Sequence, residues 1–231
     1  PALIKPASGG GGGPLGVPDT TVHAISSTDT NPSFGSVDVG TYSGNRLFLV
    51  CFQHVFSKFS GSAAWGSAVT LDGNAMTEET AARATASFGA SNTSRCQWFA
   101  LEDDASGTIT VSVTLSDSSQ SQIHVYIFED GYDAGDPIGA SQISEGGGNL
   151  THTITTTQDG STVLSGLCGL LYPGSPATGM TEVYDVQRES SAVSWSGYRT
   201  TTTAAGYASG GTISIGFSGG GCSSSIEVKA A

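Results

Sequence analysis

Two glycine motifs in this chain have the spacing of known reaction sites but not the flanking elements that the chemistry requires. Gly216–Gly220 matches G-x-S-x-G, in which a strand must turn into a helix behind the nucleophilic serine. The sequence instead predicts a strand on each side of this motif. Gly11–Gly16 matches the phosphate-binding G-x-G-x-x-G, but no strand enters it and no helix is expected after it. In a chain with 33 glycines both matches are expected by chance, and we expect no catalysis.

The histidines and cysteines are also scattered rather than clustered. They are His23, His54, His124 and His152, and Cys51, Cys96, Cys168 and Cys222. None of the spacings is typical of a metal site, and there is no C-x-x-C pair. Because His54 and His124 adjoin apolar runs, we expect hydrogen-bonded structural histidines. We expect buried free thiols, and neither a metal nor another cofactor.

Acidic residues gather in two short stretches that allow two interpretations. In Glu129–Asp136, the side chains of Asp130, Asp133 and Asp136 offer oxygen ligands of the kind that calcium prefers. Their spacing differs from the calcium-loop pattern, so a solvated turn after a strand is the alternative. Glu102–Asp104 allows the same two interpretations. Convergence of distant carboxylates in a glycosidase-like cleft also stays open at this point.

Aromatic residues suit a sugar-binding face only if they line one surface. The candidates are Trp65, Trp98, Trp195 and Tyr198. Trp98 lies in an apolar run and is expected in the core. Trp195 and Tyr198 are three residues apart, so an unbroken strand would place them on opposite faces.

Composition excludes several classes of function. Charged residues make up 12% of the 231 residues, and serine, threonine and glycine are abundant, so we expect a hydroxyl-rich surface. A formal net charge of −12 without a basic cluster argues against nucleic-acid binding. No stretch is apolar for the twenty or so residues that span a bilayer, and we expect no membrane partner. Pro1 fits removal of an initiator methionine, which indicates synthesis in a host cytoplasm.

The chain from residue 20 onward has the pattern of an all-β protein. Thr108–Leu115 alternates apolar and hydroxyl residues, as in a half-buried antiparallel strand, whereas Leu47–Phe52 is apolar throughout and suits a central strand. Asp72–Asn74 is a hairpin signal. Further strands are expected at 21–25, 67–71, 95–101, 123–128, 151–157, 162–167, 182–187, 193–199, 212–217 and 224–229. Glu78–Ala86 has helix-forming composition but many threonines and no apolar stripe. We predict a single antiparallel β-sandwich over residues 20–231.

Residues 1–19 form an extended arm rich in glycine and proline, and we predict that it docks on another protein. Five consecutive glycines lose more conformational entropy on ordering than any other sequence and have no side chains to offset the loss. A partner would supply the missing contacts. The residues expected to bind it are Leu3, Ile4, Lys5, Pro6, Gly9, Gly10, Gly11, Gly12, Gly13 and Pro14.

Several segments in succession resemble a known family. They are Gly44–Val50, Val69–Gly73 with Met76, Gln97–Leu101, Gly107–Val111, Phe128–Asp133 with Pro137–Ile138, and Ser224–Lys229. Together they are similar to a jelly-roll-like sandwich domain that recurs in structural proteins of tailed bacteriophages and in bacterial surface proteins. The resemblance covers about Thr20–Ala231, leaves only the arm outside and brings no active site. The chain departs from the family pattern in the arm and in the 175–181 loop.

The resemblance implies a non-enzymatic virion component, either a capsid decoration protein or part of a head or tail fibre. Other virion proteins would then be its partners through the arm, with homo-oligomers expected and a host-surface glycan as a further candidate. The alternative is a carbohydrate-binding or adhesin module of a secreted or surface protein.

Overall fold

The computed structural model describes residues 15, 18–29, 31–56, 67–88, 92–115, 119–170, 180–189, 192–199, 212–217 and 220–231. Antiparallel strands make up most of this part of the chain, as the sequence predicted. The strands are β1 (Thr20–Asp29), β2 (Ser33–Asp38), β3 (Arg46–Phe56), β4 (Ser67–Leu71), β5 (Asn74–Ala75), β6 (Thr77–Glu78), β7 (Ala84–Phe88), β8 (Asn92–Asp103), β9 (Thr108–Thr114), β10 (Ser119–Phe128), β11 (Ile138–Gly146), β12 (Leu150–Thr155), β13 (Thr162–Leu170), β14 (Thr181–Glu189), β15 (Ala192–Arg199), β16 (Thr212–Phe217) and β17 (Gly220–Val228).

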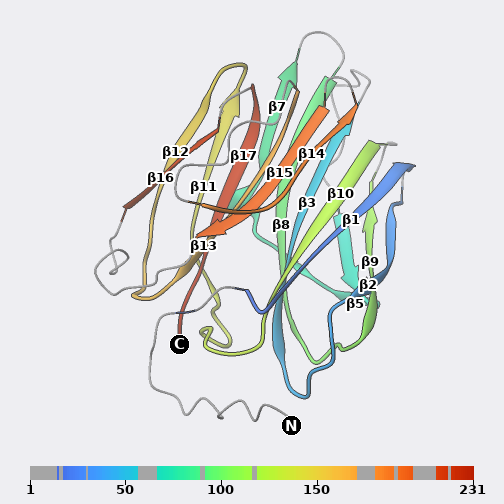
Figure 1. The fold of residues 1–231 in the computed structure, drawn as a ribbon, viewed down its shortest axis with the longest axis vertical. Helices are drawn as coiled ribbons and strands as arrows, with labels where there is room; N and C mark the ends of the chain where they lie inside the picture. Colours follow the sequence, from blue (N-terminus) through green and yellow to red (C-terminus); the bar gives the residue numbers. More distant parts are fainter. Residues whose placement is uncertain are drawn as a thin grey trace.

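The strands form four sheets that lie beside one another (Figure 1). The central sheet has the order β1-β10-β3-β8-β6, with β7 also paired to β8. A first outer sheet (β2-β9-β4-β5) covers one face of the central sheet, and a second outer sheet (β11-β17-β13-β15-β14) covers the other. The two-stranded sheet β12-β16 packs beyond the second outer sheet. The all-β antiparallel sandwich is therefore confirmed, and it has more layers than two.

Strand β3 shows why the central sheet can be covered on both faces. Its even-numbered residues Phe48, Val50 and Phe52 enter the core under the first outer sheet, while Leu47 and Leu49 face the second. Each of these five side chains is fully buried. Successive side chains of a strand point to opposite faces, so an unbroken apolar run is what a doubly covered strand requires. The prediction of a central strand at 47–52 is confirmed.

The first outer sheet has one buried face and one face toward solvent. Along β9, Ile109, Val111 and Val113 are buried and the intervening hydroxyl residues are not. Its hairpin between β4 and β5 turns at Asp72 and Gly73, whose φ angles of 47° and 87° match the two positive values of a type I′ turn. Both sequence predictions for this sheet are confirmed.

The helix-forming composition of 78–86 gives only one short helical turn. Thr80–Ala82 forms a 3-10 helix, and β7 begins two residues later. Ala82, Ala84 and Ala86 are buried against the second outer sheet. Small side chains at these positions let the two sheets approach, and this tertiary packing overrides helix propensity.

Ala68 forms a bulge in β4 that the sequence did not indicate. Its φ is 47°, in the left-handed region, and the β4-β9 register shifts between Ser67 and Thr70. A side chain in this conformation costs about 1 kcal/mol relative to glycine. Ala68→Gly is therefore expected to raise the free energy of unfolding by about 0.5 kcal/mol after the entropy loss of glycine. Urea unfolding checks this, with Ala75→Gly in β5 as the control that should not stabilise. An equal or lower stability of Ala68→Gly would contradict the strain.

Candidate functional site

The loop Glu129–Pro137, here called the acidic loop, is held by the last residues of the chain. The Asp133 amide donates to the Lys229 carbonyl (3.0 Å), and the Lys229 amide donates to the Pro137 carbonyl (2.8 Å). Tyr132 and Ala230 form an isolated bridge, and both are buried in the core beneath the second outer sheet. The loop is therefore part of the folded body.

A lysine lies where the calcium interpretation of this loop would require a cation. Lys229 Nζ contacts the carboxylate of Asp136 and lies 4.0 Å from that of Asp133. Asp130 accepts a hydrogen bond from the Tyr42 hydroxyl (3.4 Å) instead. No group of three or more metal-ligating side chains with suitable geometry occurs among the described residues. These contacts favour the turn interpretation, with Lys229 supplying the counter-charge.

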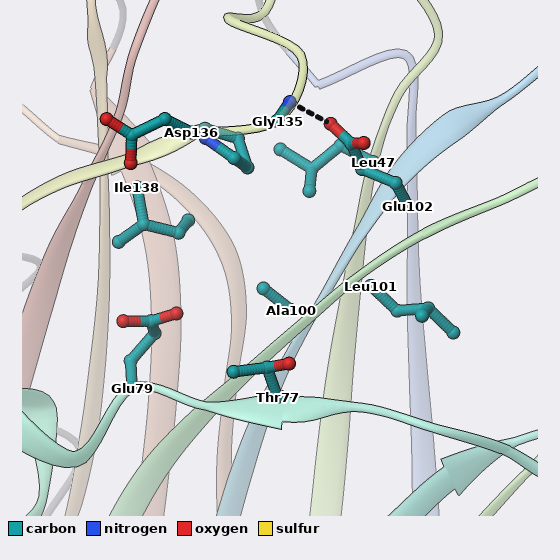
Figure 2. Close-up of a pocket in the computed structure, with 10 residues that line it drawn as sticks. Leu47, Thr77, Glu79, Ala100, Leu101, Glu102, Gly135, Asp136 and Ile138 are labelled. Carbon is teal, nitrogen blue, oxygen red and sulfur yellow. Dashed lines mark hydrogen bonds between the residues drawn. The ribbon is translucent and has the colours of Figure 1, made fainter.

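A pocket of about 390 Å³ opens between the acidic loop, the start of β3, the end of β8 and the segment after β6 (Figure 2). Leu47, Ala100, Leu101, Pro137 and Ile138 provide its apolar walls. Figure 2 shows three carboxylates around these walls, from Glu79, Glu102 and Asp136. An apolar cavity with a few convergent polar groups is the usual form of a small binding site.

The three carboxylates differ in their surroundings. Burial raises the pKa of Glu79, and the charges of Asp136 and Glu78 raise it further. Glu102 accepts a hydrogen bond from the Gly135 amide (3.0 Å), and Asp136 is paired with Lys229. Within the described part of the chain, Glu79 and Glu102 form no ion pair. The pocket is thus suited to a group with an apolar stem and a positive tip.

Arg46 fixes the first residues of β3, from which Leu47 enters the pocket. Its guanidinium is fully buried and donates to the Val39 carbonyl (2.7 Å) and to the Ala105 carbonyl. The same group lies 5.0 Å from the Phe48 ring centroid and 5.6 Å from that of Tyr42. Arg46 therefore holds together the loops that precede β3 and β9.

Leu15 fixes the end of the glycine-rich segment on the body. Its side chain is 3% exposed in the core beneath the second outer sheet. Its amide donates to the Gly160 carbonyl (2.8 Å), and its carbonyl accepts from the Thr162 hydroxyl (3.2 Å). A Cβ atom on Gly131 of the acidic loop would lie 3.6 Å from Leu15 Cδ1. Leu15, which lies inside the arm predicted as residues 1–19, therefore attaches that arm to the folded body of the same chain.

All ten residues predicted to bind a partner lie outside the described residues. These are Leu3, Ile4, Lys5, Pro6, Gly9, Gly10, Gly11, Gly12, Gly13 and Pro14, and Trp65 lies outside as well. The Trp195 and Tyr198 side chains are also not described, although both residues belong to β15. Trp98 is fully buried and packs on Tyr126 at 5.9 Å, as expected of a core residue.

The G-x-S-x-G match has no structural support as a nucleophile elbow. β16 ends at Phe217 and β17 begins at Gly220, so the motif connects two strands. A helix behind the serine is therefore missing, as the sequence predicted.

The four cysteines gather between the central and second outer sheets. All are buried and none forms a disulfide. Cys51 Sγ lies 3.5 Å from Cys96 Sγ, while Cys168 and Cys222 are opposite each other on β13 and β17. Burial raises the pKa values of Cys96 and Cys222, so these thiols are poor nucleophiles. The prediction of buried free thiols is confirmed.

The described histidine side chains are structural. His152 contacts the hydroxyls of Ser225 (2.6 Å) and Ser223 (3.2 Å) through its two ring nitrogens. His124 Nε2 lies 3.2 Å from Gln122 Nε2. Burial, followed by the charge of Arg95, lowers the pKa of His54. His124 in β10 is thus buried and hydrogen-bonded as expected, His152 in β12 is likewise buried and hydrogen-bonded, and His54 in β3 is buried.

His152 makes stability depend on pH. Burial lowers its pKa to about 4, while the unfolded residue titrates near 6.5. Between these values the unfolded state binds more protons, so stability falls as the pH falls and levels off below about 4. From pH 7.5 to 4.5 we expect His152 to account for a loss of about 2.5 kcal/mol. Urea unfolding of His152→Gln should show a correspondingly smaller loss than the unmodified protein, and equal losses would contradict this assignment.

Glu79 is the pocket residue that sequence reasoning missed. It belongs to no motif, and the composition around it suggested a helix. Its place in the pocket follows from the pairing of β6 with β8 and from the path of the acidic loop. The acidic stretches Glu102–Asp104 and Glu129–Asp136 were the usable signals, because Glu102 and Asp136 belong to the same pocket.

Among the described residues no helix has the length and apolar character needed to cross a membrane. No protein-family model matches the chain, and comparison with curated proteins and with solved structures likewise finds no match.

Proposed function

We propose that this protein is a non-enzymatic structural subunit of a bacteriophage particle, attached to neighbouring virion proteins by residues 1–14. The anchored Leu15 is the observation on which the proposal rests most. When a partner binds residues 1–14, any force on this segment is transmitted to the chain at Leu15. Leu15 belongs to the same buried cluster as Leu47, Tyr126 and Ile226. Force is therefore borne by the packed central and second outer sheets rather than by the edge strand β1.

The chemistry of the segment fits attachment. Leu3 and Ile4 can fill apolar recesses of a partner, and Lys5 can pair with a carboxylate. Pro6 and Pro14 restrict the unbound segment and reduce the entropy lost on binding. The particle location itself rests on the resemblance to jelly-roll-like domains of tailed bacteriophages, and the homo-oligomers expected from it are part of the same proposal.

The test is the variant Leu3→Ser/Ile4→Ser/Lys5→Glu in the full chain. We expect its copy number on purified particles to fall at least about tenfold, which corresponds to roughly 1.4 kcal/mol of lost binding energy. Its melting temperature should not change, because we expect these three side chains to contact the partner and not the buried clusters that the described residues form. The control is Asp104→Asn, an exposed acidic residue outside the pocket. Normal occupancy of the triple variant would contradict the proposal.

One observation favours a second function, hydrolysis of a glycan. Glu79 has a raised pKa and Asp136 lies close enough to contribute to it, which is the pattern of a carboxylic acid beside a carboxylate. An assay for reducing sugars released from host-surface polysaccharide distinguishes glycan hydrolysis from a purely structural role. We expect no release. Release that Glu79→Gln abolishes would support the enzyme and overturn the structural proposal.

The carbohydrate-binding alternative needs exposed aromatic platforms. Among the described residues Trp98 is buried, and the other tryptophan side chains are not described. A glycan array of the full chain is the discriminating measurement, and saturable binding to one glycan class would favour this alternative.

A further inference from the structure

The pocket lined by Glu79, Glu102 and Asp136, here called the acidic pocket, suits an occupant with a positive charge and an apolar stem. Three carboxylates surround apolar walls, and Lys229 pairs with only one of them, Asp136. Glu79 is half-buried and forms no ion pair with a cation among the described residues, and its pKa is raised by burial and by the charges of Asp136 and Glu78. A neighbouring ammonium group would relieve this cost.

One segment of this chain supplies both parts of such an occupant. Leu3-Ile4-Lys5 places two branched apolar side chains next to an ammonium group, and Lys5 is the only basic residue in positions 1–19. The long lysine side chain can extend along an apolar wall while its charge meets a carboxylate. Charge and shape therefore favour this segment over an acidic or purely polar one.

The anchored Leu15 brings the segment within reach. Leu15 lies against Gly131, and Gly135, four residues further along the acidic loop, lines the pocket. Four residues of chain span at most about 14 Å, so Gly131 and Gly135 are no further apart than this. The ten residues from Lys5 to Leu15 have a root-mean-square span of roughly 17 Å as a glycine-rich coil. A tether of matching length gives an effective concentration in the millimolar range, so even a weak contact is populated.

We propose that Leu3–Lys5 of the same chain occupies the acidic pocket when the protein is not assembled. This contact rests on the proposed function and regulates it, because residues held in the subunit's own pocket are not available to a neighbour. If nine tenths of the chains are closed, the apparent affinity for the neighbour falls about tenfold. Assembly then requires a partner that binds the segment better than the pocket does.

The experiment uses paramagnetic broadening in the full chain. A nitroxide on Ala2→Cys is selective because the four native cysteines are buried. We expect the amide signals of Thr77, Ala100 and Gly135 to lose most of their intensity, whereas those of the distant β12 should keep theirs. Lys5→Glu and, separately, Glu79→Gln should restore the lost signals. The matched control Asp104→Asn should leave the broadening unchanged.

A mixed sample distinguishes the same chain from a second copy. Nitroxide-labelled chains without isotope are added to isotope-labelled chains without nitroxide, and no broadening is expected at the pocket. Broadening at the pocket in this mixture would overturn the proposal in favour of exchange between copies. Absence of broadening in the singly labelled chain, or broadening that Lys5→Glu leaves intact, would overturn it altogether.

The particle assay keeps this inference separate from the proposed function. Glu79→Gln should leave particle occupancy the same or raise it, since the pocket competes with assembly. Reduced occupancy of Glu79→Gln would contradict the inference while the effect of the Leu3–Lys5 variant still supports attachment. Normal occupancy of that variant would contradict attachment whatever the pocket binds.

Discussion

Arg46→Met is expected to lower the free energy of unfolding by about 3–5 kcal/mol. The guanidinium is fully buried and donates to the carbonyls of Val39 and Ala105. Methionine fills most of the volume but leaves both carbonyls without their donor, and each unsatisfied buried group costs about 1–3 kcal/mol. Urea unfolding monitored by tryptophan fluorescence gives the change directly.

Arg83 is the matched control for Arg46. Its side chain is 35% exposed, and it pairs with Glu78, whose side chain is 16% exposed and lies next to the pocket residues Thr77 and Glu79. Exposed ion pairs contribute about 1 kcal/mol or less, so Arg83→Met should have a correspondingly small effect. If the two variants lost equal stability, Arg46 would not be the residue that organises the loops at the start of β3.

Gly166→Ala is expected to cost about 2–3 kcal/mol, because the added methyl group has no room between the sheets. Gly166 lies on β13, and a Cβ atom there would be 2.5 Å from Cys51 Sγ and 3.0 Å from Cys96 Sγ. The second outer sheet would have to move away from the central sheet. Gly148→Ala is the control, since nothing lies within 4 Å of a Cβ atom at that turn.

A double-mutant cycle assigns the Gly166 effect to the cysteine contact. Cys51→Ala removes the nearest of three close contacts at position 166, while Gln53 Nε2 and Cys96 Sγ stay 2.9 Å and 3.0 Å from the added Cβ atom. The double variant should be more stable than the sum of the two single changes predicts, by about 1 kcal/mol. Strict additivity would show that the cost of Gly166→Ala arises elsewhere.

The sequence predicted the strands that are apolar or clearly alternating, and missed those that are neither. β11 has the sequence Ile138–Gly146 with glycines and serines, and none of its residues is fully buried, so it carries no periodic signal. In β2, a bulge at Gly35 and Ser36 interrupts the alternation between Phe34 and Val37. Edge strands and bulged strands depend on their neighbours, which local pattern does not encode.

The local sequence pattern also did not predict that the fold has more than two layers of sheet. Leu47–Phe52 indicates a strand covered on both faces, but the pattern does not say which strands cover it. The second outer sheet packs on the central sheet through small residues such as Gly166, Cys168 and Cys222, which contribute little to a hydrophobic sequence pattern. Their role is to permit close approach, and this becomes visible only when the facing strand is known.

The pocket was predictable only in part because its residues come from four separate segments. The acidic loop was singled out as a candidate calcium site, and Lys229 changes that interpretation by pairing with Asp136. Glu79 follows β6, a strand of two residues that no propensity argument would detect. Long-range contacts between such segments decide the site.

In the proposed attachment, residues 1–14 extend from the anchored Leu15 and bind a neighbouring virion protein. An electron cryo-microscopy reconstruction of the assembled particle tests it directly, because the path of the main chain before Leu15 can be traced. We expect continuous density from Leu15 into an adjacent protein, with Leu3 and Ile4 in apolar recesses there. Density that returns from Leu15 to the acidic pocket of its own subunit within the assembled particle would contradict it.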